Sequence, residues 1–339
     1  MSTIWRQATQ HSAPTRQVLA TTADPRDTEE RVVTVKSRHT VLVAEQVHVI
    51  VFDISLPRTC HPAVTFVRGN LLHKDHVQAA LTILGDDLHV QSVFHMASLI
   101  PFMEVPDKAV ERVNFDGTRV LLDVCQASKT VSSFIYTSSA TLTEDVGYPS
   151  EHLDTYTQTK VAAERLVLAA NNQTTQFATC ALRPTSMFGR RDKILSDGLR
   201  ALECVAVAHR LVLDALRTPA GRARVGGQAY FVGNDEEKTF GWFLGLDTDK
   251  KASGISHWNK PVPMIIPLWL VHVLCFVNDT IFQLSGVVVI DSYLTASLVD
   301  YTQRTYTFSS AKAKRDFGYV PLCSVKEKIR ELATKAKTN

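Results

Sequence analysis

Residues 134–160 read FIYTSSATLTEDVGYPSEHLDTYTQTK, and this stretch carries the clearest change from strand to helix in the chain. Its first part, from Phe134 to Thr137, is a short apolar and aromatic run that stops at two serines, which is typical of a buried strand. The segment from Tyr156 to Ala170 has the spacing and length of a helix. A buried strand followed by such a helix is the repeating unit of a parallel sheet.

The same alternation extends in both directions along the chain. Further strand-like runs and helical segments are expected at 49–52, 64–67, 74–84, 92–97, 110–127 and 177–182. This order predicts an α/β protein with a Rossmann-like, doubly wound parallel sheet. Such sheets bind ligands at the carboxyl ends of their strands, where the polar residues singled out below fall.

The change of pattern along the chain predicts three regions. Residues 1–30 are polar and are expected to form a loose N-terminal extension, residues 31–189 carry the Rossmann-like domain, and residues 190–339 are expected to form a smaller substrate-binding lobe. The most apolar stretch, residues 264–277, is too short to span a bilayer. It is interpreted either as a core helix or as an interfacial membrane helix anchored by Trp269.

Composition excludes several classes of protein. The chain has 339 residues, of which 45% are hydrophobic and 21% charged, as in ordinary globular proteins. A net charge of +3 without a basic cluster gives no expectation of nucleic-acid binding. The six cysteines are widely spaced without a C-x-x-C pair, which favours free thiols in a reducing compartment over disulfides or a metal site. Because the N-terminus lacks a secretory pattern, a cytoplasmic location is expected.

The pair Tyr156 and Lys160 is the candidate catalytic centre. On a helix, residues four positions apart share a face, so the ammonium of Lys160 can approach the phenol. A nearby cation favours the phenolate and lowers the pKa of a tyrosine, as a general base for an alcohol requires. The spacing alone is weak, since an exposed helical pair would show it as well. Ser138 and Ser139 strengthen it, because a hydroxyl there can bond the substrate oxygen.

Together these residues resemble the catalytic signature of the extended short-chain dehydrogenases. Further segments are similar to motifs of that family, in the same order: Val93–Ser98, Val113–Thr118, Leu182–Gly189, Tyr230–Asp235 and Phe308–Tyr319. The last two resemble the branch that acts on 3β-hydroxysteroids and sterol-4α-carboxylates. The resemblance covers about residues 49–331.

The resemblance implies a role for each matching residue. Tyr156 would be the general base, Lys160 would activate it and bond the nicotinamide ribose, and Ser139 or Ser138 would orient the substrate hydroxyl. Asp53 would bind the adenosine ribose and, by repelling a 2′-phosphate, would favour NAD over NADP. No metal is implied. The implied cofactor-binding residues are Asp53, Asn70, Leu71, Ala97, Tyr156, Lys160, Pro184, Thr185 and Ser186.

The function implied is NAD-dependent oxidation of a 3β-hydroxyl on a steroid or sterol. Two alternatives stay open: a non-catalytic or incomplete product of the same family that has lost cofactor binding, and a sugar-nucleotide epimerase or reductase. Peripheral membrane contact through residues 264–277, a homodimer, and a location at the cytosolic face of the endoplasmic reticulum are compatible with this resemblance.

The chain departs from the family pattern in two places. The family has a glycine-rich turn about twenty residues before the acidic residue, where backbone N–H groups approach the pyrophosphate. Here the first glycine of the chain is Gly69, and residues 31–47 contain none. Side chains at such a turn would crowd the phosphates, so weak cofactor binding is expected. The segment 190–217 is also shorter than the family pattern.

Overall fold

The computed structural model describes most of the chain between residues 31 and 321. The described residues are 31–35, 48–55, 64–85, 89–99, 105–140, 154–185, 201–233, 235–236, 267–285, 299 and 308–321. The expected extension over residues 1–30 lies outside them.

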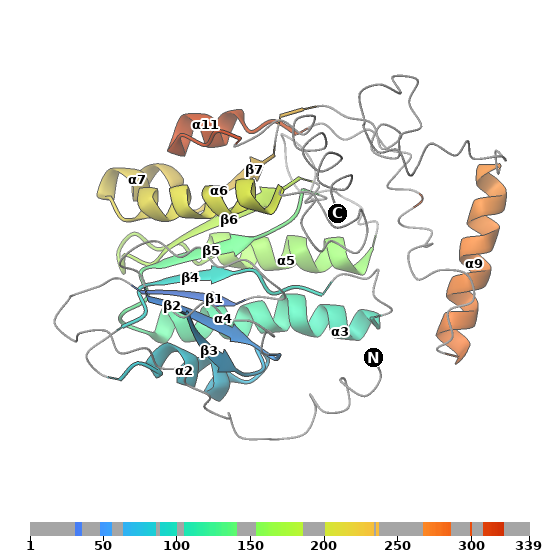
Figure 1. The fold of residues 1–339 in the computed structure, drawn as a ribbon, viewed down its shortest axis with the longest axis horizontal. Helices are drawn as coiled ribbons and strands as arrows, with labels where there is room; N and C mark the ends of the chain where they lie inside the picture. Colours follow the sequence, from blue (N-terminus) through green and yellow to red (C-terminus); the bar gives the residue numbers. More distant parts are fainter. Residues whose placement is uncertain are drawn as a thin grey trace, which may run out of the picture.

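A parallel sheet of seven strands forms the centre of the molecule (Figure 1). Its order is β3-β2-β1-β4-β5-β6-β7, and each neighbouring pair is parallel. The chain therefore reverses its direction of winding between β1 and β4, which is the expected doubly wound topology. The strands are β1 Arg31–Val35, β2 His48–Asp53, β3 Val64–Arg68, β4 Ser92–His95, β5 Ser133–Thr137, β6 Ala178–Pro184 and β7 Gln228–Val232.

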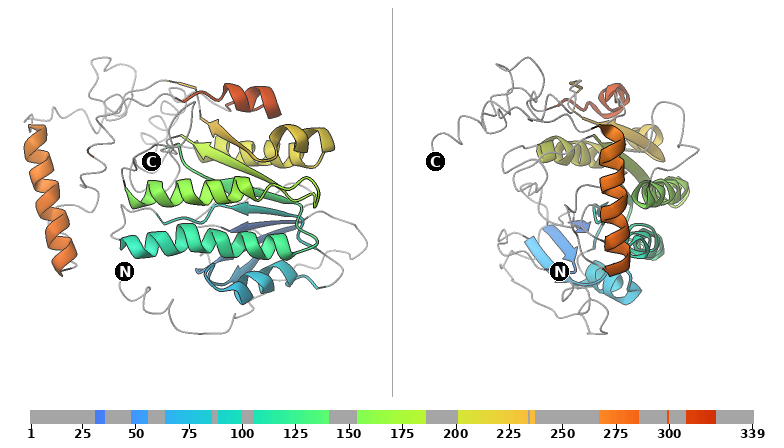
Figure 2. Two further views of the ribbon diagram at one scale, coloured as in Figure 1. Left: turned by 180° about the vertical axis from the view of Figure 1, so that it is seen from behind. Right: turned by 90° about the vertical axis from the view of Figure 1, so that its right-hand side faces the viewer.

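Helices cover both faces of the sheet, as Figures 1 and 2 show. The helices of the described residues are α2 Lys74–Thr82, α3 Asp107–Glu111, the π-helix η2 Arg112–Asp116, α4 Gly117–Ala127, α5 Thr155–Ala169, α6 Ala201–Leu216, α7 Pro219–Val225, α11 Ala311–Phe317 and, apart from the sheet, α9 Leu268–Ser285. The expected α/β fold is confirmed.

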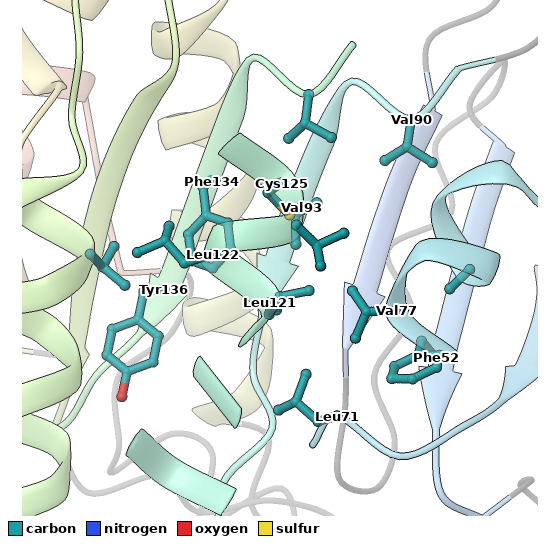
Figure 3. Packing of buried hydrophobic residues seen from close by; sticks show 14 of the residues in the cluster. Phe52, Leu71, Val77, Val90, Val93, Leu121, Leu122, Cys125, Phe134 and Tyr136 are labelled. Carbon is teal, nitrogen blue, oxygen red and sulfur yellow. The ribbon is translucent and has the colours of Figure 1, made fainter. Parts of the chain in front are cut away.

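Alternate residues of β5 pack into two separate hydrophobic cores, one on each face of the sheet. Phe134 and Tyr136 belong to the core beneath α2, α4 and α5, and Ile135 belongs to the core beneath α6, α7 and α11. Figure 3 shows the first of these cores, with Tyr136 at its edge. Because side chains of a strand point alternately to opposite faces, a fully apolar strand is what a sheet covered on both sides requires.

The chain after residue 189 also contributes to the sheet. Helix α6 packs on β5, β6 and β7, α7 packs against α6, and β7 forms the outer strand of the sheet beside β6. The assignment of residues 190–339 to a substrate-binding lobe remains a prediction.

The apolar stretch predicted at 264–277 overlaps helix α9, which runs from Leu268 to Ser285 and stands apart from the sheet in Figure 1 and in the left view of Figure 2. The helix extends beyond residue 277, where the predicted stretch ends, and Asn278 within it is buried, with 3% exposure. Within the described residues, no helix is long and apolar enough to cross a membrane.

Candidate active site

Motifs far apart in the sequence meet at the carboxyl edge of the sheet. Because the strands run parallel, the residues that end or follow them share this edge. Ser186 lies outside the described residues. The other predicted residues are Asp53 at the end of β2, Asn70 and Leu71 after β3, Ala97 after β4, Ser138 and Ser139 after β5, and Pro184 and Thr185 at and after the end of β6.

Tyr156 stands in the first turn of α5, where an N-cap fixes the start of the helix. The carboxylate of Asp154 accepts a 2.6 Å hydrogen bond from the backbone N–H of Thr157. Such a cap satisfies one of the free N–H groups of the first turn. Lys160 follows one turn later on the same face of α5.

The two serines after β5 have different surroundings. Ser139 shares a side-chain hydrogen bond with the phenol of Tyr156, as does Ser98, which follows β4. Ser138 is buried at 4% exposure, and its hydroxyl has no hydrogen-bond partner within the described part of the chain. The backbone N–H of Ser138 donates to the Leu182 carbonyl at 2.7 Å. Ser139 is thus the serine that faces Tyr156, and Ser98 is a neighbour that the motifs did not single out.

Lys160 is buried, with 2% exposure. Its Nζ donates a 2.7 Å hydrogen bond to the Thr137 carbonyl and lies 4.4 Å from the ring centroid of Tyr136. Burial lowers the pKa of Lys160 to about 7, and the negative charge of Glu164 acts in the opposite direction. Near neutral pH this lysine is therefore close to the midpoint of its titration.

The pKa of Tyr156 is displaced upward, although the sequence led us to expect that Lys160 would lower it. Burial raises the pKa, as does the charge of Asp154, while the hydrogen bonds with Ser139 and Ser98 lower it. The physical reason is that a phenolate in a partly buried position loses hydration. The expected effect of Lys160 on Tyr156 remains a prediction.

Asn114 holds the segment after β4 against α5. Its Oδ1 accepts hydrogen bonds from the Leu99 N–H at 2.7 Å and the Ser98 hydroxyl at 3.2 Å. Its Nδ2 donates to the Leu99 carbonyl at 3.0 Å and to the Thr159 hydroxyl at 3.3 Å. Asn114 therefore braces the segment after β4, and Ser98 is positioned through it.

Two histidines near the site are neutral packing residues. Burial lowers the pKa of His95 to about 3 and that of His209 to about 4. His209 on α6 shares a 2.8 Å hydrogen bond with the hydroxyl of Thr137, the residue whose carbonyl holds Lys160. The sequence offered only a faint helix motif around His209 as a signal.

Asp53 and Asn70, the residues expected to bind the adenosine part of the cofactor, each accept a hydrogen bond from a backbone N–H two residues further on. Asp53 Oδ1 accepts from the Ser55 N–H at 2.9 Å, which orients the carboxylate at the end of β2. Asn70 Oδ1 accepts from the Leu72 N–H at 3.0 Å. The side chain of Leu71 is 6% exposed and packs in the core, close to Gly117. Ribose recognition by Asp53 and Asn70 remains a prediction.

The described residues fit part of a dinucleotide. Along the carboxyl edge of the sheet, the carboxylate of Asp53 lies at one end, after β2, and Tyr156, Lys160 and Ser139 lie at the other end, beyond β5, with β1 between them. The buried, unpartnered hydroxyl of Ser138 adds a free donor near the second end. Residues 36–47, which follow β1 at the centre, are glycine-free and lie outside the described residues. Within the described residues no cluster of three or more metal-ligating side chains occurs.

The four described cysteines are free and buried, as the spacing predicted. They are Cys125, Cys180, Cys204 and Cys275.

Similarity to solved structures supports the fold. A UDP-glucose 4-epimerase from Thermotoga maritima aligns with a TM-score of 0.62 at 14% identity, covering 91% of this chain and 99% of the epimerase. A short-chain dehydrogenase/reductase superfamily protein from Agrobacterium tumefaciens, solved with bound NAD, aligns with a TM-score of 0.56 at 17% identity, covering 91% and 98%.

Similarity in sequence is more specific. Mouse sterol-4-alpha-carboxylate 3-dehydrogenase, decarboxylating, is 30% identical over 303 residues, which cover 79% of each chain. The Candida albicans enzyme of the same name is 29% identical over 290 residues, covering 76% of this chain and 79% of its own. Human short-chain dehydrogenase/reductase family 42E member 1 is 29% identical over 317 residues, covering 80% and 77%.

A family model described as the 3-beta hydroxysteroid dehydrogenase/isomerase family matches residues 41–204. The match begins after β1 and includes β2 to β6 and α5, which carry the site residues described above. By family the chain is an oxidoreductase acting on an alcohol. This chain belongs to the 3-beta hydroxysteroid dehydrogenase/isomerase family.

Proposed function

We propose that this protein oxidises the 3β-hydroxyl of a steroid or sterol with NAD. The observation that carries the proposal is the hydrogen bond between Ser139 and Tyr156 at the carboxyl edge of the sheet, with Lys160 one turn away on α5. The names of the mouse and Candida albicans relatives support a sterol substrate.

The proposed roles follow from the contacts. Ser139 would hold the substrate hydroxyl beside Tyr156, and Tyr156 would remove its proton. A charged Lys160 would favour the phenolate. When bound, the nicotinamide would take a hydride from the carbinol carbon. Ser98 would help to orient the phenol of Tyr156, since its side chain also forms a hydrogen bond with that phenol.

Asp53 supports NAD as the cofactor rather than NADP. Its carboxylate ends β2, the strand next to β1, and is oriented by the N–H of Ser55. A carboxylate at this position accepts hydrogen bonds from ribose hydroxyls and repels a 2′-phosphate.

A steady-state assay tests this proposal directly. With millimolar NAD, the purified chain is expected to reduce NAD in the presence of a 3β-hydroxysterol or its 4α-carboxylate. It should reduce NADP at least about tenfold more slowly, because Asp53 repels the 2′-phosphate. A tenfold difference corresponds to about 1.4 kcal/mol. NADH formation is followed by absorbance.

The control substrate in that assay is UDP-glucose. Turnover of UDP-glucose without sterol oxidation would replace the proposal by the sugar-nucleotide alternative. Turnover of neither substrate by a folded chain would favour the non-catalytic alternative, for which the glycine-free residues 36–47 are the supporting observation.

We further propose that α9 contacts a membrane surface, at the cytosolic face of the endoplasmic reticulum. Trp269, Val273 and Phe276 are 67%, 47% and 70% exposed and lie at helical spacing on one face, whereas Cys275 and Asn278 are buried. An exposed apolar face with a tryptophan suits the headgroup region, where a sterol substrate would be taken up.

Flotation with phosphatidylcholine vesicles tests the membrane contact. The Trp269→Ser/Phe276→Ser variant is expected to lose most of the vesicle-bound fraction, because it removes the two most exposed rings of this face. Val320→Ser, at an exposed position after α11, is the matched control and should bind as the unchanged protein does. Equal binding of all three proteins would contradict the proposal.

A further inference from the structure

Glu164 carries a buried carboxylate one helical turn after Lys160, on the helix that also carries Tyr156. Glu164 is 0% exposed and belongs to α5. It follows Lys160 by four residues, as Lys160 follows Tyr156, so the three side chains lie along one face of the helix. Glu164 was not among the residues predicted from the sequence, although its spacing from Lys160 repeats that of Lys160 from Tyr156.

Glu164 forms an ion pair with Arg183 of β6. The guanidinium binds both carboxylate oxygens, with Nη2 at 2.6 Å from Oε1 and Nε at 3.0 Å from Oε2. The ring of Phe231 lies over this guanidinium, with 5.1 Å between Cζ and the ring centroid. Burying such a pair costs hydration, and apolar side chains of similar size would often stabilise a fold as well. Stabilisation of the fold alone therefore does not explain the ion pair between Glu164 and Arg183.

The surroundings of Lys160 give Glu164 a role. From β5, Lys160 contacts the Thr137 carbonyl and the Tyr136 ring, neither of which carries a full charge. From β4, His95 is neutral because burial lowers its pKa to about 3. Tyr156, on α5 itself, holds its proton more firmly because burial raises its pKa. Glu164 is the group whose negative charge favours protonation of Lys160.

We propose that Glu164 is a positioning residue that keeps Lys160 charged, and that Arg183 limits the strength of this effect by neutralising part of the carboxylate. The inference rests on the proposed function only in that a charged Lys160 is what activates Tyr156. Glu164 thereby determines the upper pH at which the pair remains competent.

The two halves of the ion pair are expected to act in opposite directions. In Glu164→Gln the favourable charge is lost, so Lys160 should release its proton about one pH unit lower. In Arg183→Gln the carboxylate is no longer shared, so Lys160 should retain its proton to a higher pH. Asp214→Asn, in an exposed ion pair with Arg210 on α6, is the matched control and should leave the titration unchanged.

The measurement is an NMR titration of side chains labelled at lysine Cε and Nζ, with the Lys160 signal assigned by its absence in Lys160→Met. Opposite shifts in the two variants support the proposal. An unmoved titration, or shifts in the same direction, accompanied by a lower melting temperature in both variants, would show that the pair is merely structural.

The test remains decisive if Arg183→Gln fails to fold. The double variant Glu164→Gln/Arg183→Met removes both charges, and Lys160 should then titrate below its position in the unchanged protein. A titration at or above that position would overturn the proposal. Because this readout needs no turnover, a failure to oxidise sterols would sink the proposed function and leave this inference standing. If the chain oxidises sterols but the titration of Lys160 is the same in all variants, the proposed function would stand and this inference would be overturned.

Discussion

Tyr156→Phe is expected to lower kcat/KM for 3β-hydroxysterol oxidation by about 100-fold to 10,000-fold, the usual contribution of a general base. The phenol is the group that would take the substrate proton, and phenylalanine fills the same space without it. The ring stays in the first turn of α5, where the Asp154 cap is unaffected. Initial rates at millimolar NAD, together with circular dichroism of both proteins, provide the measurement.

Tyr230→Phe is the matched control for this prediction. It removes a phenol hydroxyl that is buried away from the site and bonds Asp316 at 3.0 Å. This control should lose some stability and keep its rate. Turnover by Tyr156→Phe at the rate of the unchanged chain would remove Tyr156 from its assigned role.

Restoring a glycine turn is expected to tighten NADH binding at least about a hundredfold. Two backbone N–H bonds to a charged phosphate, at about 1.5 kcal/mol each, amount to about 3 kcal/mol, or roughly two factors of ten in affinity. The variant replaces residues 31–47 by a strand, a glycine-rich turn and a helix start that follow the family pattern. Isothermal titration of NADH into both proteins measures the gain.

The control is the same replacement with its turn glycines changed to alanine. It keeps the new strand and helix but places Cβ atoms where the phosphates approach, so most of the gain should disappear. If the alanine version binds as tightly as the glycine version, the glycine turn is not what this chain lacks.

The sequence was sufficient for the fold and for expecting the candidate residues at one edge of the sheet. Strand-like runs such as 49–52 and 134–137 mark buried strands because a sheet covered on both faces needs apolar residues throughout. Once the strands are parallel, residues such as Asp53 and Ser139 must share one edge. The spacing of Tyr156 and Lys160 then follows from helical geometry alone.

Contacts between distant segments could not be derived in the same way. The pairing of Glu164 with Arg183, and of Thr137 with His209, depends on how α5 and α6 pack on the sheet. The choice between Ser138 and Ser139 depends on which way the chain turns after β5. The upward displacement of the pKa of Tyr156 depends on burial, which a motif does not report.

The chain after residue 189 was the least predictable part. The sequence suggested a smaller substrate-binding lobe there, and within the described residues β7 extends the sheet beside β6 while α6 packs on it. A short strand such as Gln228–Val232 resembles an isolated apolar run until its neighbour in the sheet is known. Helix α9 also continues beyond residue 277, where the apolar stretch ends, through the buried Asn278.

The most direct test of this account is a titration of the purified, unaltered chain with NADH, beside the mouse relative under the same conditions. We expect saturable binding with a dissociation constant at least about a hundredfold higher than that of the relative. This is the effect of losing two backbone hydrogen bonds to the charged phosphates of the cofactor. Low-micromolar affinity equal to that of the relative would contradict it, because the cofactor would then be held without the glycine turn.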